Sequence, residues 1–344
     1  MQYLSTQALI NDTEVEYKLL KGVETIQALG KFGVMKEHPR NKTDTITFSR
    51  LNPFNMSSTT GAPQIVAQDF IYAEGATPDI NTISYTDVTC TLNEYDVLFK
   101  YSNKTALMHE HKIPDDMIAL TARTMAEVAE LVAYGQFKAG TSVVYANGST
   151  RAGLNQPISL NVLRQAVRAM DVNRATEVTT MIGSGPNFGT GTAPGGYICF
   201  VSSDGAADAR DLDHFVPCEA YGTARKKIHP KEIGACEEFT FIKSPLFTAW
   251  LASGDTYDGT MYSAAAAAND VYPMIVMGAD AWGHVSLKGR GYTGIRPVHV
   301  PWDQASHYNP ARKFGFVGAT FDYNAVRLNE FWMQRIEACV SKLN

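Results

Sequence analysis

The order of apolar and polar positions predicts two extended strands in the first third of the chain. The two classes alternate residue by residue over 45–49 and again over 88–92, the period of two that half-buried strands show. Residues 52–63 between them are rich in Ser, Thr, Gly and Pro, and the stretch 37–103 as a whole holds ten Thr and five Ser. We therefore expect a long hairpin with a polar excursion at its end. It has too few large apolar residues to form a core of its own.

A long amphipathic helix is predicted over residues 114–138. Pro114 lies where a first helical turn tolerates proline, and Asp115 and Asp116 follow at the positive end of the helix dipole. Apolar residues from Met117 onward then recur near one face. About 25 residues at a rise of 1.5 Å would give a rod of roughly 37 Å, which is long for a globular helix.

The region 155–320 has the pattern of a compact α/β unit. Short apolar runs typical of buried strands alternate with amphipathic segments, one of which follows a capping residue, Ser159. The predicted helices cover 160–170, 206–215 and a short segment after Asp280, and the predicted strands cover 197–202, 271–277 and 313–319.

The sequence leaves the secondary structure of three segments open. Periodicity over 330–340 fits a strand or a helix equally well. The run 264–268 consists of alanines, and we expect a small helix or a tightly packed segment. Residues 1–36 are weakly periodic, and we expect an arm with a short stretch of helix.

Composition narrows the class of protein. Of the 344 residues, 45% are hydrophobic and 19% charged, which indicates a folded globular chain. A net charge of −5 argues against a dedicated reader of duplex DNA but permits non-specific contact with it. No apolar run approaches the ~20 residues of a membrane span, and no signal peptide is visible. The five cysteines form no CxxC pair, so we expect synthesis in a reducing cytoplasm without disulfides or structural zinc.

Two motifs suggest ligand chemistry, and neither is in the right context. The glycine-rich stretch 183–191 would need a strand before it and a helix after it to cradle phosphate, but the predicted order is the reverse, so we expect a loop. His109 and His111 flank Glu110 just before the long helix, with no third metal ligand in sight. We predict no cofactor and no metal site.

Two further clusters contain residue types that occur in functional sites. Cys199 and Cys218, together with Asp213 and His214, supply the residue types of a thiol nucleophile, although nothing in the sequence brings them together. Isolated cysteines in buried strands usually only pack, and we predict no catalytic residue. The basic run Arg225-Lys226-Lys227 precedes several glutamates and suits a solvated face or a salt bridge between subunits.

A polar hairpin, a long helix and an α/β unit, in that order, resemble the major capsid proteins of tailed phages with the Hong Kong 97-type fold. More narrowly, the sequence resembles the coat proteins of N-four-like podophages. The resemblance is spread over short segments: residues 42–48, 74–78, 127–135, Ala209 to Leu212 with Phe215, 232–234, and 271–273 with Gly278, Asp280 and Ala281.

The resemblance implies an α+β fold with four parts. These are an N-terminal arm over 1–36, an extended β-hairpin loop over 37–103, a peripheral domain over 104–150 and 300–344 whose spine helix covers 114–138, and an axial domain over 151–299. It also implies hexamers and pentamers of the chain in an icosahedral shell around double-stranded DNA, with portal and scaffold or decoration proteins as further partners. The location would be the virion capsid.

The predicted contacts between subunits come mainly from the hairpin. They are Ile46, Phe48, Phe54, Ile65, Phe70 and Glu74, joined by the basic run Arg225, Lys226 and Lys227. Two alternatives stay open from the sequence. One is an encapsulin-like nanocompartment shell, which shares the fold, and the other is an α/β hydrolase-like enzyme that uses Cys199 or Cys218.

Overall fold

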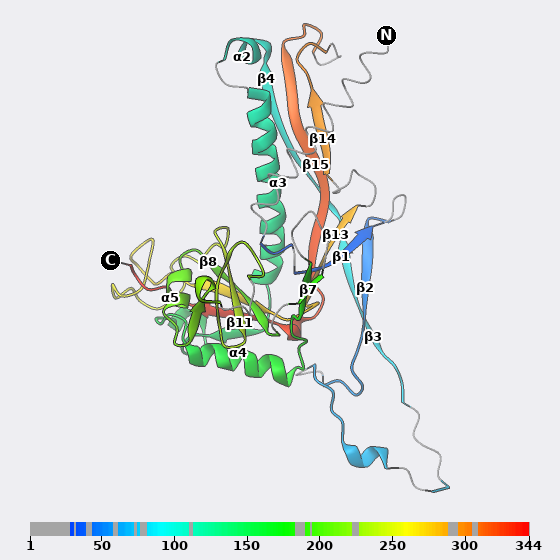
Figure 1. Cartoon of the computed structure of the whole chain (residues 1–344), viewed down its shortest axis with the longest axis vertical. Coiled ribbons are helices and arrows are strands. Elements are labelled where there is room, and N and C mark those ends of the chain that lie inside the picture. Colours follow the sequence, from blue (N-terminus) through cyan, green and yellow to red (C-terminus); the bar gives the residue numbers. More distant parts are fainter. Residues whose placement is uncertain are drawn as a thin grey trace.

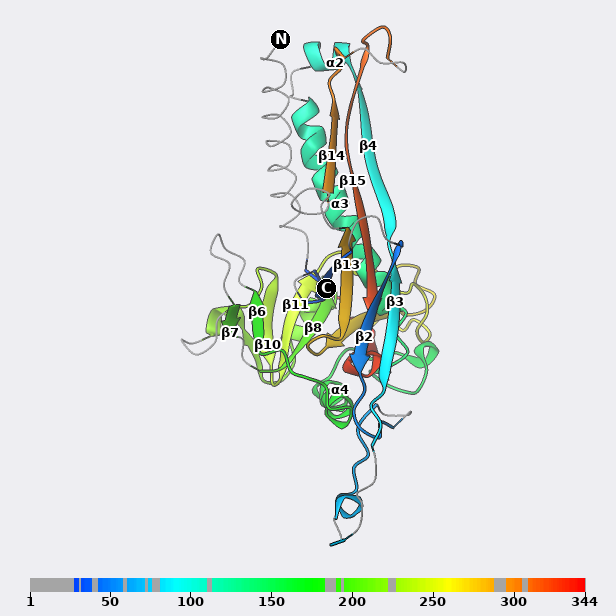
Figure 2. The ribbon, with the colours of Figure 1, turned by 90° about the vertical axis from the view of Figure 1, so that its right-hand side faces the viewer.

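The computed structural model describes residues 28–30, 32–38, 43–57, 61–71, 74–75, 81–109, 113–182, 190–192, 195–221, 227–287, 295–304 and 309–343. The molecule is elongated (Figure 1). One long helix and a narrow sheet form an upright part, a second sheet with short helices lies at its foot, and a thin hairpin extends beyond both (Figure 2). The predicted arm helix before residue 28 lies outside the described residues.

Helix α3 (Ile113–Lys138) confirms the predicted spine helix almost residue for residue. Its first turn carries Asp115 and Asp116 and its last turn Lys138, as the helix dipole favours. The buried face packs on β4 (Asn93–Ser102) and β15 (Phe314–Arg327). The apolar core there comprises Tyr101, Ile118, Ala122, Met125, Ala129, Val317, Ala319 and Phe321. None of the described helices is long and apolar enough to cross a membrane.

Strand β15 organises a five-stranded sheet. It pairs along one edge with β4 and along the other with β14 (Ile295–Val300) and then β13 (Trp282–Leu287), which in turn pairs with β1 (Val34–His38). The predicted strand 313–319 is therefore only the first half of a 14-residue strand. The helix expected after Asp280 is wrong, because β13 begins at Trp282 and is held between β1 and β15. We call α3, β4, β14 and β15 the spine region.

The pairing of β4 with β15 depends on Gly318. A Cβ atom there would overlap the Val97 carbonyl and lie 2.8 Å from Leu98 Cδ1. We expect Gly318→Ala to lower the free energy of unfolding by about 1–3 kcal/mol, the usual cost of overpacking. At Gly135 in α3 an added Cβ atom would meet nothing within 4 Å, so Gly135→Ala should raise that free energy by about 0.5–1 kcal/mol. Urea unfolding of both variants tests this, and a Gly318→Ala protein as stable as wild type would contradict it.

The second sheet has seven strands in the order β5-β16-β12-β8-β11-β10-β9. Its central strands, β12 (Tyr272–Met277) and β8 (Tyr197–Ser202), are completely buried and confirm two predicted strands. The others are β5 (Val143–Tyr145), β9 (Phe215–Pro217), β10 (Glu232–Cys236), β11 (Phe239–Ser244) and β16 (Met333–Ala338). Helix α4 (Leu160–Val172) confirms the predicted helix 160–170 and packs on this sheet through Val162, Leu163, Ala166 and Met170. We call this sheet, α4 and α5 (Ala206–Arg210) the axial region.

Several local expectations for the axial region need correction. Helix α5 stops at Arg210 rather than 215, since Phe215 starts β9 and pairs with Cys236 of β10. Residues 264–268 form neither a helix nor a packed segment but a bent, largely exposed stretch. Residues 330–340 resolve into a 3-10 turn, Glu330–Trp332, followed by strand β16.

The predicted domain limits stay a prediction, and strand pairing crosses them in several places. Strands β5 and β16, which fall in the predicted peripheral segments, lie in the axial sheet. Strand β4, which falls in the predicted loop 37–103, lies in the spine region. The part of the loop that leaves the body is therefore residues 43–92, which we call the extended hairpin.

The extended hairpin is built on β2 (Thr45–Leu51) and β3 (Tyr85–Thr91), which pair in antiparallel register and confirm the two alternating strands. We call the segment between these two strands, residues 52–84, the excursion. It contains a 3-10 turn, Ala67–Phe70. The remaining short elements are α2 (Asn103–Met108), β6 (Thr180–Ile182), β7 (Thr190–Thr192) and 3-10 turns at Arg151–Gly153 and Cys218–Ala220.

Candidate assembly surfaces

The base of the extended hairpin is anchored on its own chain. Phe48 is 8% exposed and Cys90 2% exposed, and both pack against Val285 of β13. Ile46 is partly buried beside them. Phe48 thus has little surface left for a neighbouring subunit, whereas Ile46 keeps part of the surface that the predicted contact needs.

The excursion touches the body once more at Gly61. This residue has φ +65, and a Cβ atom there would lie 2.7 Å from Phe331 Cγ, so glycine is required on both counts. The turn is closed by the Ser57 amide, which donates to the Ala62 carbonyl at 2.9 Å. This contact fixes the direction in which the rest of the excursion leaves the body.

On both sides of Gly61 in the sequence, the excursion exposes apolar side chains. Phe54 and Phe70 pack edge to face with ring centroids 5.7 Å apart, yet they remain 40% and 53% exposed. Of the twenty large apolar side chains exposed in the described part of the chain, eight lie between Leu51 and Tyr85: Leu51, Phe54, Ile65, Val66, Phe70, Ile71, Ile83 and Tyr85. Such a concentration on a thin projection indicates a surface that a partner covers.

The remaining predicted contact residues are exposed or undescribed. Glu74 is exposed in the excursion. Arg225 and Lys226 lie outside the described residues, and Lys227 is exposed. Next to the basic run, buried Glu232 accepts hydrogen bonds from the Ile228 amide at 2.6 Å and the Tyr221 hydroxyl at 2.7 Å.

The candidate nucleophiles are poorly placed for catalysis. Cys199 is fully buried in the central strand β8, and this burial raises the pKa of its thiol. Burial, together with the nearby Glu232, also raises the pKa of Cys218, whose Sγ donates to the Glu232 carbonyl at 3.1 Å. Burial therefore disfavours the thiolate at both positions.

The two ligand motifs gain no support. Residues 110–112 lie outside the described part of the chain. Among the described residues, no group of three or more His, Cys, Asp or Glu could hold a metal. Residues 183–189 are also outside it, but the flanking segments β6 and β7 pair with each other, so the glycine-rich stretch joins two strands. That is not the strand-to-helix order that phosphate binding needs.

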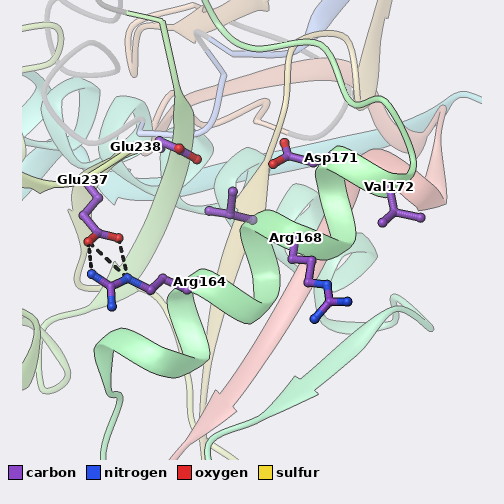
Figure 3. Close-up of a pocket in the computed structure, with 7 residues that line it drawn as sticks. Arg164, Arg168, Asp171, Val172, Glu237 and Glu238 are labelled. Atoms are coloured by element: carbon purple, nitrogen blue, oxygen red, sulfur yellow. Dashed lines mark hydrogen bonds and ion pairs between the residues drawn. The ribbon is translucent and has the colours of Figure 1, made fainter.

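A shallow groove lies between α4 and the turn from β10 to β11 (Figure 3). Arg164 and Glu237 form an ion pair at one end, and the carboxylates of Asp171 and Glu238 face each other across it. Partial burial and the neighbouring carboxylates raise the pKa of Glu238. The groove is lined mainly by charged side chains of both signs and lacks the apolar walls of a substrate pocket.

A buried carboxylate joins the arm to the spine helix. Glu130, 2% exposed on α3, accepts hydrogen bonds from the amides of Ala28 and Leu29 at 3.1–3.2 Å. Burial raises the pKa of Glu130, although these amides and the charge of Lys231 oppose the shift. The sequence signal for this joint is a glutamate on the helix face that also carries Ala126, Ala133 and Phe137, and it was missed.

Comparison with known proteins identifies the architecture. No model of a protein family and no curated protein matches the sequence. The capsid of Ralstonia phage GP4 matches in structure with a TM-score of 0.63 at 10% identity, over 90% of this chain and 87% of that one. The head of Helicobacter pylori bacteriophage KHP40 matches with a TM-score of 0.57 at 9% identity, over 91% and 88%. The chain has the Hong Kong 97-type capsid fold.

The extent of these matches shows that the capsid fold covers the whole architecture rather than one sheet. The capsid of a native GTA particle gives the same picture, with a TM-score of 0.53 at 11% identity over 89% of this chain and 88% of the other. The predicted fold is thereby confirmed. The narrower resemblance to N-four-like coat proteins stays a prediction.

Proposed function

We propose that the chain is the structural major capsid protein of a tailed phage. Copies of it form hexamers and pentamers, and these close into an icosahedral shell around double-stranded DNA. The observation that carries the proposal is the capsid fold combined with a hairpin whose apolar surface the described residues leave open. The protein acts through surfaces and not through catalysis.

In this proposal the extended hairpin lies over a neighbouring subunit. Phe54, Ile65 and Phe70 supply apolar area. Glu74 is exposed in the same projection, and Ile46 keeps part of its surface open at the base of the hairpin. Each such contact is small, but a closed shell repeats it many times, and linked contacts hold far more tightly than single ones. Phe48 is left out of the contact because β13 already covers it.

Other partners follow from the same role. The net charge of −5 fits a shell that touches packaged DNA non-specifically rather than gripping it. A portal and a scaffold or decoration protein would complete the particle. Synthesis and assembly would take place in the cytoplasm of the bacterial host, and the finished protein would reside in the virion.

The particle mass of the purified chain tests the proposal. In light scattering we expect species of at least a pentamer or hexamer, far above the 37.7 kDa of one chain, and in negative-stain micrographs closed shells or rings. A strictly monomeric protein across a range of salt and crowding conditions would sink the proposal.

A further inference from the structure

Three cationic side chains converge on one indole where the spine helix meets the axial sheet. The Arg151 guanidinium carbon lies 3.7 Å from the ring centroid of Trp250, and Lys138 Nζ lies 4.6 Å from it. The Arg335 guanidinium carbon is 5.3 Å away. The three come from separate segments: the last residue of α3, the turn Arg151–Gly153 and strand β16.

One carboxylate pairs with two of these three cations. Glu337, 0% exposed, accepts from Arg151 Nε and Nη2, both at 2.7 Å, and from Arg335 Nε at 2.9 Å. Among the described residues no other carboxylate forms an ion pair with the three cations. Three positive charges against one negative leave an excess of two.

The cluster is also rich in donors. Arg335 Nη1 donates to the carbonyls of Lys138 and Gly140, and Lys138 Nζ donates to the Thr248 carbonyl at 3.2 Å. Arg335 Nη2 and Arg151 Nη1 have no acceptor among the described residues. Burial lowers the pKa of Lys138, and the charges of Arg151 and Arg335 lower it further, so the cations repel one another.

We propose that this cluster is a binding site for a doubly charged tetrahedral oxyanion of the phosphate class. Two negative charges balance the excess, and the oxygens of a tetrahedral anion can accept from the remaining guanidinium N–H groups and from an ammonium at once. The site opens to solvent on the Arg151 side, where that side chain is 32% exposed. A single carboxylate would bring one negative charge and leave the other unbalanced.

Inorganic phosphate is the probe that tests the site on the purified full chain. Isothermal titration and thermal unfolding, with chloride at matched ionic strength as the reference, should show saturable binding and a rise in Tm. Lys138→Gln removes one cation from the exposed end of α3, and we expect it to weaken phosphate binding at least about tenfold.

The matched control is Lys100→Gln. Lys100 also stacks on an aromatic ring, with Nζ 3.7 Å from the centroid of Phe314, but it lies on β4 away from the cluster. This variant should bind phosphate as the wild type does. Wild-type protein without saturable phosphate binding, or equal binding by the two variants, would overturn the proposal. Whether the wild type binds phosphate saturably is decided by titrating the wild type alone.

Discussion

A subunit in which Phe54 and Phe70 are both replaced by serine is expected to fold normally and to lose assembly. The two rings pack on each other in the excursion and belong to none of the buried core clusters of the described chain. Covering a large apolar side chain contributes about 1.5–3 kcal/mol, and the loss recurs at every copy of the contact. Light scattering should show the particle mass falling to that of a free subunit or a single ring, while circular dichroism stays as in wild type.

The matched control replaces Leu131 and Val172 with serine. These side chains are 44% and 52% exposed, close to the values for Phe54 and Phe70, but they lie on α3 and α4. We expect this control to assemble. Full assembly of the hairpin variant, or equal dissociation of both variants, would show that the hairpin is not the contact we infer.

Removing the buried carboxylate of Glu337 is expected to destabilise the subunit by about 3–5 kcal/mol. Glu337 binds Arg151 and Arg335. Arg335 in turn donates to the carbonyls of Lys138, the last residue of the spine helix, and of Gly140 just beyond it. In Glu337→Ala the two guanidinium groups lose their only paired anion within the described residues while Arg335 stays buried. The free energy of unfolding in urea, measured on free subunits, gives the magnitude.

The control for this change is Glu127→Gln. Glu127 pairs with Arg123 one turn away on α3, and that pair is largely open to solvent. Exposed pairs of this kind contribute about 0.3–0.5 kcal/mol, so the control should stay close to wild type. If Glu337→Ala lowered the free energy of unfolding by less than about 1 kcal/mol, the Glu337 ion pairs would not be what holds the spine helix on the axial sheet.

Elements with strong local periodicity could be predicted from the sequence. The spine helix, α4 and the strands β8 and β12 each carry their pattern within the segment itself, and the structure confirms all four. The alternation over 45–49 and 88–92 likewise predicts which faces of β2 and β3 are covered, and the two strands pair as expected. In these cases burial follows directly from local order.

Elements defined by distant partners could not be predicted. Strand β13 was expected to be helical, and it is extended because β1 and β15 flank it, from about 250 residues before it and 40 after it. The second half of β15 and the end of α5 follow the same rule. Long-range pairing overrides local propensity at these positions.

At the candidate surfaces, the burial of single side chains also depends on distant partners and could not be predicted. Phe48 and Phe54 look alike in the sequence, but β13 covers the first and leaves the second exposed. Glu337 sits between Ile336 and Ala338 in a completely buried strand, a placement that signals a paired charge once the strand is known. Its partner Arg151 is 186 residues away, so no local pattern reveals the pair.

An electron cryo-microscopy map of the assembled protein tests the central claim most directly. We predict a closed shell in which the extended hairpin of each copy lies on a neighbouring copy, with Phe54 and Phe70 covered by it. A shell in which these two rings remain in solvent, or a preparation that contains only free subunits, would contradict the account.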